Sequence, residues 1–219
     1  MTEQQPVTFT GEELIEILES QSSQRALRVT SGEVRNNGNE AGFEIHTTPD
    51  KRVFIPFIRF GEKTRLLRDD GGGEQEFMGG YKTLHQIQGK LLNLHFHPEE
   101  DPIVPSNSDL HTISISTAAP EHLPSILAVG ALRANGGIEM LLMRRPSLGV
   151  LFSDSIQEYS EHIDPYPFSI SREQVTAALS IIGVKSFLIR FNYRRRRYSL
   201  DDASKELLLD FDPITVSLV

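Results

Sequence analysis

Apolar residues recur along this chain first with a helical spacing and then with an alternating one. An apolar stripe over residues 14–18 follows Thr10-Gly11-Glu12-Glu13, whose threonine and last glutamate have the spacing of a capping box. We predict an amphipathic helix that ends near Ser20, with residues 1–9 as a loose tail. Across residues 26–60, short apolar stretches alternate with polar residues between turn-forming segments, and this pattern indicates strands.

The middle of the chain carries the clearest strand and turn signals. Residues 90–97 form a mostly apolar run that stops at Pro98, which predicts a buried strand. Two further apolar runs, residues 125–133 and 138–144, bracket Asn135-Gly136-Gly137, a sequence typical of a hairpin turn. We therefore expect one strand followed, later in the chain, by a β-hairpin.

The remaining segments have a weaker periodicity. Residues 68–80, which contain three consecutive glycines, and residues 154–167 are polar and are interpreted as loops. Ser171-Arg172-Glu173-Gln174 is a second capping box and predicts another helix. Residues 184–193 and 206–211 are interpreted as late strands.

Together these elements predict a mixed α+β fold in which a central mixed β-sheet is flanked by helices. With 219 residues the chain is long enough to bury a substantial core. We interpret residues 10–145 as the core of the fold. Residues 146–219 are either the C-terminal part of the same domain or an extension of it.

Composition narrows the chemistry further. The chain has no cysteine, which excludes disulfides, thiol nucleophiles and cysteine-ligated metals. Its formal net charge of -8 argues against a general nucleic-acid binder. The N-terminus has neither a basic start nor an apolar run, and no later window approaches the roughly 18 apolar residues of a membrane span. We therefore expect a cytoplasmic protein that does not insert into membranes.

Two histidines one residue apart form the best candidate for a catalytic metal site. His95 and His97 belong to the predicted strand, so their side chains point to the same face of it. Asp109 follows Ser106, a candidate helix cap, and the helix would bring its carboxylate to the histidines. Two imidazoles and a carboxylate are good zinc ligands and leave a fourth position for water. Ser106 is close enough in sequence to stabilise negative charge on an attacked carbonyl oxygen.

The same residues resemble the signature of the JAB/MPN (JAMM) zinc metalloproteases. That signature is a His-x-His pair, usually followed by proline, and then Ser-x-x-Asp after a spacer. It is matched here by His95-Phe96-His97-Pro98 and by Ser106 and Asp109. The spacer between His97 and Ser106 has eight residues, one more than is common in the family.

The family also places a catalytic glutamate upstream, in a segment rich in glycine and apolar residues. Residues 40–45, Glu-Ala-Gly-Phe-Glu-Ile, look most like that segment. The resemblance assigns the glutamate to Glu40, with Glu44 and then Glu33 as alternatives.

The resemblance implies a JAB/MPN-like fold of the cytidine-deaminase-like three-layer type, and a zinc-dependent hydrolase of amide or isopeptide bonds. Glu40 would be the general base, His95, His97 and Asp109 would hold the zinc, and Ser106 would stabilise the oxyanion. The expected substrates are ubiquitin-like or other protein and peptide tails, which an exposed strand edge could bind by strand addition. The alternatives are a catalytically silent scaffold or protein-binding module and, more weakly, a nucleic-acid-processing protein.

One basic run stands apart from this site. Arg194-Arg195-Arg196-Arg197 lies between Tyr193 and Tyr198 and directly follows a predicted strand. We interpret it as a solvated edge strand, because charge on an edge discourages aggregation. An acidic partner surface and a nucleic-acid contact are the alternatives.

Overall fold

The computed structural model describes residues 5–61, 75–77, 89–97, 103–113, 124–144, 153–163 and 171–218. Most strands belong to one sheet, in the order β10-β9-β8-β7-β6-β2-β4-β5, with β3 paired to β2. Only β6 and β7 run parallel among its described neighbours, so the sheet is mixed. Its strands are β2 (Ala41–Thr47), β3 (Val53–Phe54), β4 (Phe57–Phe60), β5 (Gln75–Phe77), β6 (Gly89–Phe96), β7 (Ile126–Leu132), β8 (Ile138–Arg144), β9 (Lys185–Arg194) and β10 (Arg197–Leu200).

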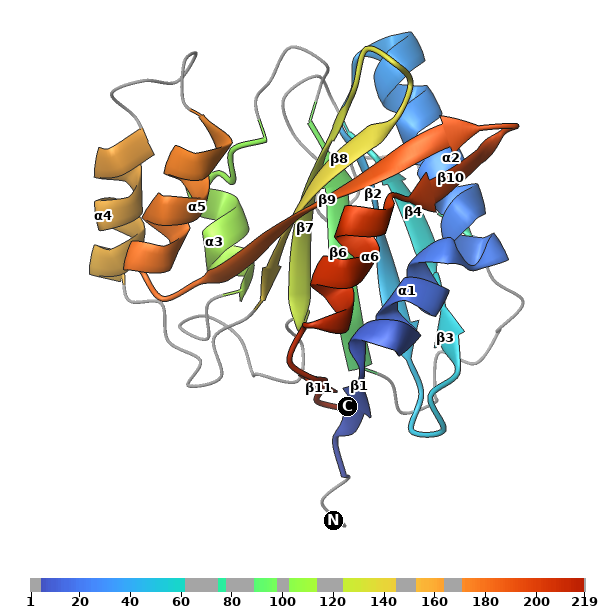
Figure 1. Cartoon of the computed structure of the whole chain (residues 1–219), viewed down its shortest axis with the longest axis horizontal. Coiled ribbons are helices and arrows are strands. Elements are labelled where there is room, and N and C mark those ends of the chain that lie inside the picture. Colours follow the sequence, from blue (N-terminus) through green and yellow to red (C-terminus); the bar gives the residue numbers. More distant parts are fainter. Residues whose placement is uncertain are drawn as a thin grey trace.

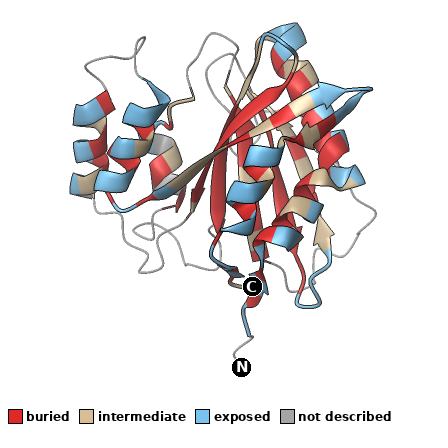
Figure 2. Cartoon of the chain, viewed as in Figure 1, coloured by how far each residue is buried: buried red, intermediate tan, exposed pale blue. Residues whose placement is uncertain are grey.

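Helices cover both faces of this sheet (Figure 1). On one face lie α1 (Gly11–Glu19), α2 (Gln21–Asn37) and α6 (Asp202–Leu209); on the other lie α3 (Asn107–Ile113), α4 (Ser153–Ile163) and α5 (Arg172–Ile181). The central strands β2, β6, β7 and β8 are mostly buried between them (Figure 2). The predicted mixed α+β fold, with a central mixed sheet flanked by helices, is therefore confirmed.

Alternation along the strands separates the two cores. In β7, for example, Ile126 and Ala128 face the core under α1 and α2, whereas Leu127 and Val129 face the core under α3, α4 and α5. This pattern matters for function because it decides which helix each side chain of β6 meets.

The predicted helix caps and the hairpin are confirmed. Thr10 and Glu13 form a reciprocal capping box at α1, and Ser171 and Gln174 form one at α5. The turn at Asn135-Gly136-Gly137 joins β7 to β8 as an antiparallel pair.

Several predictions of local structure were wrong. Residues 26–37 belong to α2 rather than to strands, because Ser20 caps a helix whose buried face includes the small polar residues Ser23, Thr30 and Ser31. Those residues obscure the helical spacing of the apolar ones. Val7 to Phe9, assigned to the loose tail, form β1 (Val7–Phe9) and pair with β11 (Ile214–Val216).

Two further segments were assigned to the wrong class. Residues 153–163 form α4, not a loop, with Ile156, Tyr159 and Ile163 buried at helical spacing. Residues 206–209 end α6, which Asp201 caps, rather than forming a strand. Within the glycine-rich segment Gln75–Phe77 form β5, and the rest of that segment lies outside the described residues.

Candidate metal centre

The strand β6 carries His95 and ends one residue before His97, and its neighbouring strands hold both histidines. On one side it pairs in parallel with β7, where Phe96 lies opposite Gly130. The His97 N–H donates to the Gly130 carbonyl at 3.0 Å and extends this pairing by one residue. Gly130 also leaves room for the Phe96 ring, since a Cβ there would lie 2.7 Å from the ring. The backbone at His97 is therefore held in register with the sheet.

On its other side β6 pairs with β2, and Gly42 lies opposite His95. A Cβ on Gly42 would lie 2.4 Å from the Leu94 carbonyl oxygen and 3.0 Å from the Cβ of His95. Contacts this short cannot form without moving one of the two strands. Glycine at position 42 thus permits the close approach of β2 to the backbone that carries the first histidine.

The third candidate ligand comes from α3. Ser106 caps this helix: its Oγ accepts from the Asp109 N–H at 3.2 Å, while the Ser106 N–H and Oγ–H both donate to Asp109 Oδ2, at 2.7 and 2.8 Å. With Oδ2 held by two donors, Oδ1 turns towards the imidazole of His95. The predicted capped helix after Ser106 is confirmed, and its cap orients the carboxylate.

Helix α4 braces this capped turn. The buried Tyr159 hydroxyl donates to the carbonyl of Pro105, the residue before the cap, at 3.0 Å. The Ser160 hydroxyl donates to Asn107 Oδ1, at the start of α3, at 2.7 Å. These supporting residues were missed from the sequence because residues 154–167 were interpreted as a loop. The helical spacing of Ile156, Tyr159 and Ile163 is the signal that could have revealed them.

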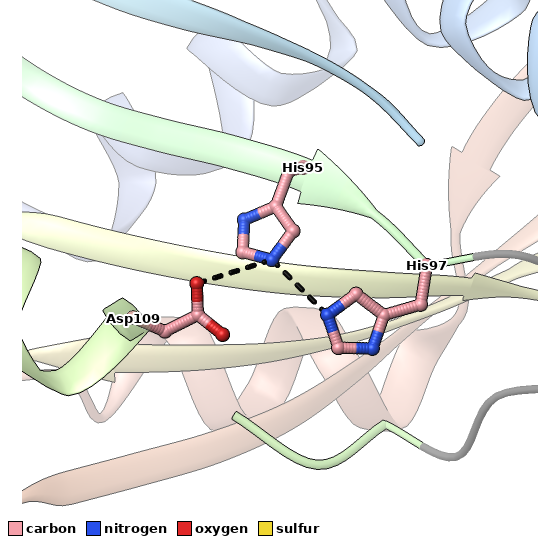
Figure 3. Close-up of side chains that lie close together, drawn as sticks. All are labelled: His95, His97 and Asp109. Carbon is pink, nitrogen blue, oxygen red and sulfur yellow. Dashed lines mark hydrogen bonds and ion pairs between the residues drawn. The ribbon is translucent and has the colours of Figure 1, made fainter. Parts of the chain in front are cut away.

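His95, His97 and Asp109 converge at one point (Figure 3). The Nε2 of His95 lies 3.2 Å from Nε2 of His97 and 3.4 Å from Oδ1 of Asp109. Bonds of zinc to nitrogen and oxygen of about 2.0–2.2 Å, at tetrahedral angles, would separate neighbouring ligand atoms by about 3.3–3.5 Å. One ligand atom from each residue lies within 4.8 Å of the others, so these three residues could hold a metal ion.

Burial keeps the His95 imidazole neutral. The side chain is 8% exposed, and its burial lowers the pKa of His95, with a further reduction from His97 and an opposing effect of the Asp109 charge, to about 4. A neutral imidazole is the form that binds a metal. At neutral pH this ligand therefore needs no proton to be removed before it binds.

The three glutamates considered from the sequence lie in different surroundings. Because Ala41 pairs with Phe96 in an antiparallel ladder, continuing the register places Glu40 opposite His97. Glu40 is partly buried, and its carbonyl accepts from the Gly61 N–H at 2.8 Å. Glu33 lies on α2, which packs on the opposite face from α3, and its carboxylate accepts from the Asn37 and Asn39 side chains.

Glu44, on β2, belongs to a buried charged network that also draws on β4 and β6. It is 4% exposed and lies 2.8 Å from His46 Nε2, 3.3 Å from Arg59 and 3.4 Å from Lys90. Burial alone would raise the pKa of Glu44, but the hydrogen bond with His46 and the charges of Lys90 and Arg59 outweigh it and lower the pKa to about 2. A carboxylate with so low a pKa is a poor proton acceptor near neutral pH.

The sequence therefore predicted which three candidate ligands lie together. Pro98 and residues 99–102 lie outside the part of the chain that the structure describes. The Glu44 network was not predicted, since only His46 lies near Glu44 in sequence and the cations Arg59 and Lys90 come from β4 and β6. Comparisons of the chain with models of protein families, with curated proteins and with solved structures found no match. Among the described helices, none is long and apolar enough to cross a membrane.

Proposed function

We propose that the protein is a zinc-dependent hydrolase of amide or isopeptide bonds, of the JAB/MPN type. The observation that supports this most is the convergence of His95, His97 and Asp109 at spacings close to those of tetrahedral zinc ligands. The proposed substrates are ubiquitin-like or other protein and peptide tails, a class that comes from the resemblance of the His-x-His and Ser-x-x-Asp motifs.

Zinc suits this donor set because it favours nitrogen and oxygen ligands when thiolates are absent, and the chain has no cysteine. Three protein ligands are also the number that a catalytic zinc site typically has. When bound, the ion would supply a Lewis acid that activates water for attack on a carbonyl.

In this proposal Glu40 is the general base. In support of this choice, Glu40 directly precedes Ala41, which pairs with Phe96, the neighbour of His97. Glu44 is a weaker choice because the pKa of its carboxyl is lowered to about 2. Glu33 is also a weaker choice, because it lies on α2, which covers the face of the sheet opposite α3. The base would accept the proton of the attacking water and pass it to the leaving amine.

Ser106 has two roles in this proposal. Its hydroxyl donates to Asp109 Oδ2, so it orients a metal ligand in the unbound protein. Stabilising an oxyanion would require that hydroxyl to turn from the carboxylate to the substrate, while the backbone N–H keeps its contact with Oδ2.

Metal analysis of the purified protein tests the first step. We expect about one equivalent of zinc per chain, and little in Asp109→Ala, because removing one of three ligands leaves two. Asp202→Ala is the matched control, since it removes an exposed carboxylate from α6, on the other face of the sheet. Less than a tenth of an equivalent in the wild-type protein, even after zinc is supplied, would contradict the proposal.

Cleavage of a ubiquitin-like protein with a short C-terminal extension tests the second step. We expect Glu40→Gln to keep its zinc and to lose at least about 100-fold in rate, within the contribution of a general base. Glu33→Gln is the control and should cleave normally. Full activity of Glu40→Gln would remove this residue from the mechanism, and a zinc-loaded wild-type protein that cleaves none of a panel of such fusions would favour a binding scaffold.

A further inference from the structure

The basic run covers the end of β9, a tight turn and the start of the edge strand β10. Arg194 pairs with Arg197 in the β9–β10 hairpin, so Arg195 and Arg196 alone make the connection. All four arginines are exposed at a tip that projects beside α2 (Figures 1 and 2). The interpretation of this segment as a solvated edge strand thus holds for Arg197, which begins the edge strand β10, and is corrected for Arg195 and Arg196, which form the turn.

This turn is an unfavourable place for arginine. Arg195 and Arg196 have φ angles of 50° and 64°, the pattern of a two-residue hairpin turn that favours Asn-Gly. Residues with a Cβ are disfavoured in this left-handed region. Four adjacent like charges add repulsion. The stability of the fold alone would thus favour other residues at positions 195 and 196.

Protection of a sheet edge does not explain the arginines either. The outward-facing N–H groups of β10 are already satisfied, because the Tyr198 N–H donates to Gln24 Oε1 at 2.8 Å and the Leu200 N–H donates to Glu19 Oε1 at 3.1 Å. An edge whose donors are occupied has little need of charge to prevent strand pairing.

Helix α2 enlarges the basic tip. Arg28 Nη1 donates to the Arg196 carbonyl at 3.3 Å, and Arg35, two helical turns along, is exposed near Gly136, close to Tyr193. We call Arg28, Arg35 and Arg194 to Arg197 the arginine patch. Within the described part of the chain, none of the ion pairs found joins a member of this patch to an acidic side chain.

We propose that the arginine patch is a docking surface for an acidic segment of a partner protein. Guanidinium groups bind carboxylates through two parallel hydrogen bonds, so a cluster without internal acidic partners suits a run of Asp or Glu. A nucleic acid fits less well. The patch contains six of the 22 Lys and Arg residues, and the rest of the chain contains all 30 Asp and Glu residues. A long polyanion that extended beyond the patch would therefore meet a strongly acidic surface.

Binding of a labelled probe tests this proposal. The probe is a fluorescent peptide of about twelve residues with alternating glutamate and serine, measured by anisotropy at low salt beside a single-stranded oligothymidylate of similar charge. Arg195→Asn/Arg196→Gly removes two charges and installs the preferred turn sequence, so it keeps the hairpin. The control, Arg52→Gln/Lys185→Gln, removes two exposed charges elsewhere.

We expect the peptide to bind the wild-type protein more tightly than the oligonucleotide does, and the turn variant to weaken peptide binding about fivefold or more, while the control binds normally. Arg28→Gln/Arg35→Gln should weaken binding similarly, which keeps the test decisive if the turn variant does not fold. Three results would overturn the proposal: no peptide binding, equal weakening in the control, or tighter binding of the oligonucleotide.

Discussion

Replacing Ser106 by alanine should weaken zinc binding by the proposed metal centre. The substitution removes the hydroxyl that donates to Asp109 Oδ2 at 2.8 Å and leaves the backbone donor at 2.7 Å. A hydrogen bond to a charged group contributes about 1.5–3 kcal/mol, and water can replace part of this because Ser106 is exposed. A remaining loss of about 1.4 kcal/mol corresponds to about a tenfold increase in the zinc Kd, the low end of what outer partners of metal ligands contribute.

Titration of zinc against a chelator of known affinity measures this Kd directly. The turnover of the zinc-saturated variant is measured in parallel, because the two roles of Ser106 affect different quantities. A residue that only stabilises the oxyanion would lower kcat and leave the zinc Kd unchanged, whereas a residue that orients Asp109 must change the Kd.

Two variants separate this effect from a general loosening of α3. Ser106→Thr keeps the hydroxyl and should restore most of the affinity. Ser160→Ala removes a nearby hydroxyl that contacts Asn107 but not Asp109, and should weaken zinc binding much less than Ser106→Ala does. The reasoning is refuted if Ser106→Ala binds zinc as tightly as the wild-type protein, or if Ser160→Ala weakens binding equally.

Three further predictions follow from other contacts. Gly42→Ala should destabilise the fold by about 1–3 kcal/mol in urea unfolding and weaken zinc binding, because its Cβ would meet the Leu94 carbonyl; unchanged values would refute the close-approach argument. Glu44→Gln should cost up to about 3 kcal/mol at pH 7, since the lowered pKa of Glu44 means that its carboxylate stabilises the fold above pH 4.5. The difference from wild type should disappear as the pH falls from 4.5 towards 2, and a constant difference would contradict it. Arg195→Asn/Arg196→Gly should raise stability by about 1–2 kcal/mol in thermal unfolding, by relieving two positive φ angles; a loss of stability would show that the arginines support the turn.

The convergence of the three candidate ligands was predictable because short-range geometry determines the directions of their side chains. Residues two apart on a strand share a face, which aligns His95 with His97. A serine followed three residues later by an aspartate caps a helix reciprocally, which turns Asp109 towards a defined side. Neither argument needs knowledge of distant parts of the chain. Only the meeting of strand and helix depends on the fold.

The segments that form α2 and α6 were misassigned for the same physical reason. In α2 the buried face includes small polar residues, so its apolar side chains are too few to show a helical period. In α6 the exposed Leu207 and Leu209 flank the buried Leu208, so an apolar run suggests a strand where only one of the three faces the core. Tertiary packing, not local pattern, decides which apolar side chain is buried.

The parts of the site are held by local spacing, by strand register or by tertiary packing. Which of these holds a part determines how well that part can be inferred from sequence. The spacing within β6 and within the Ser106 cap is local and was predicted. Glu40 depends on strand register: it is 57 positions from His97 in the chain, yet the two adjoin Ala41 and Phe96, which pair at the end of the β2–β6 ladder. The support from Tyr159 depends on tertiary packing, because α4 must dock before its hydroxyl reaches Pro105. Substitutions at the histidines or in the Ser106 cap should change metal binding most directly. Substitution of Glu40 should change turnover with the metal retained. Substitution of Tyr159 should change both metal binding and turnover through the position of the capped turn.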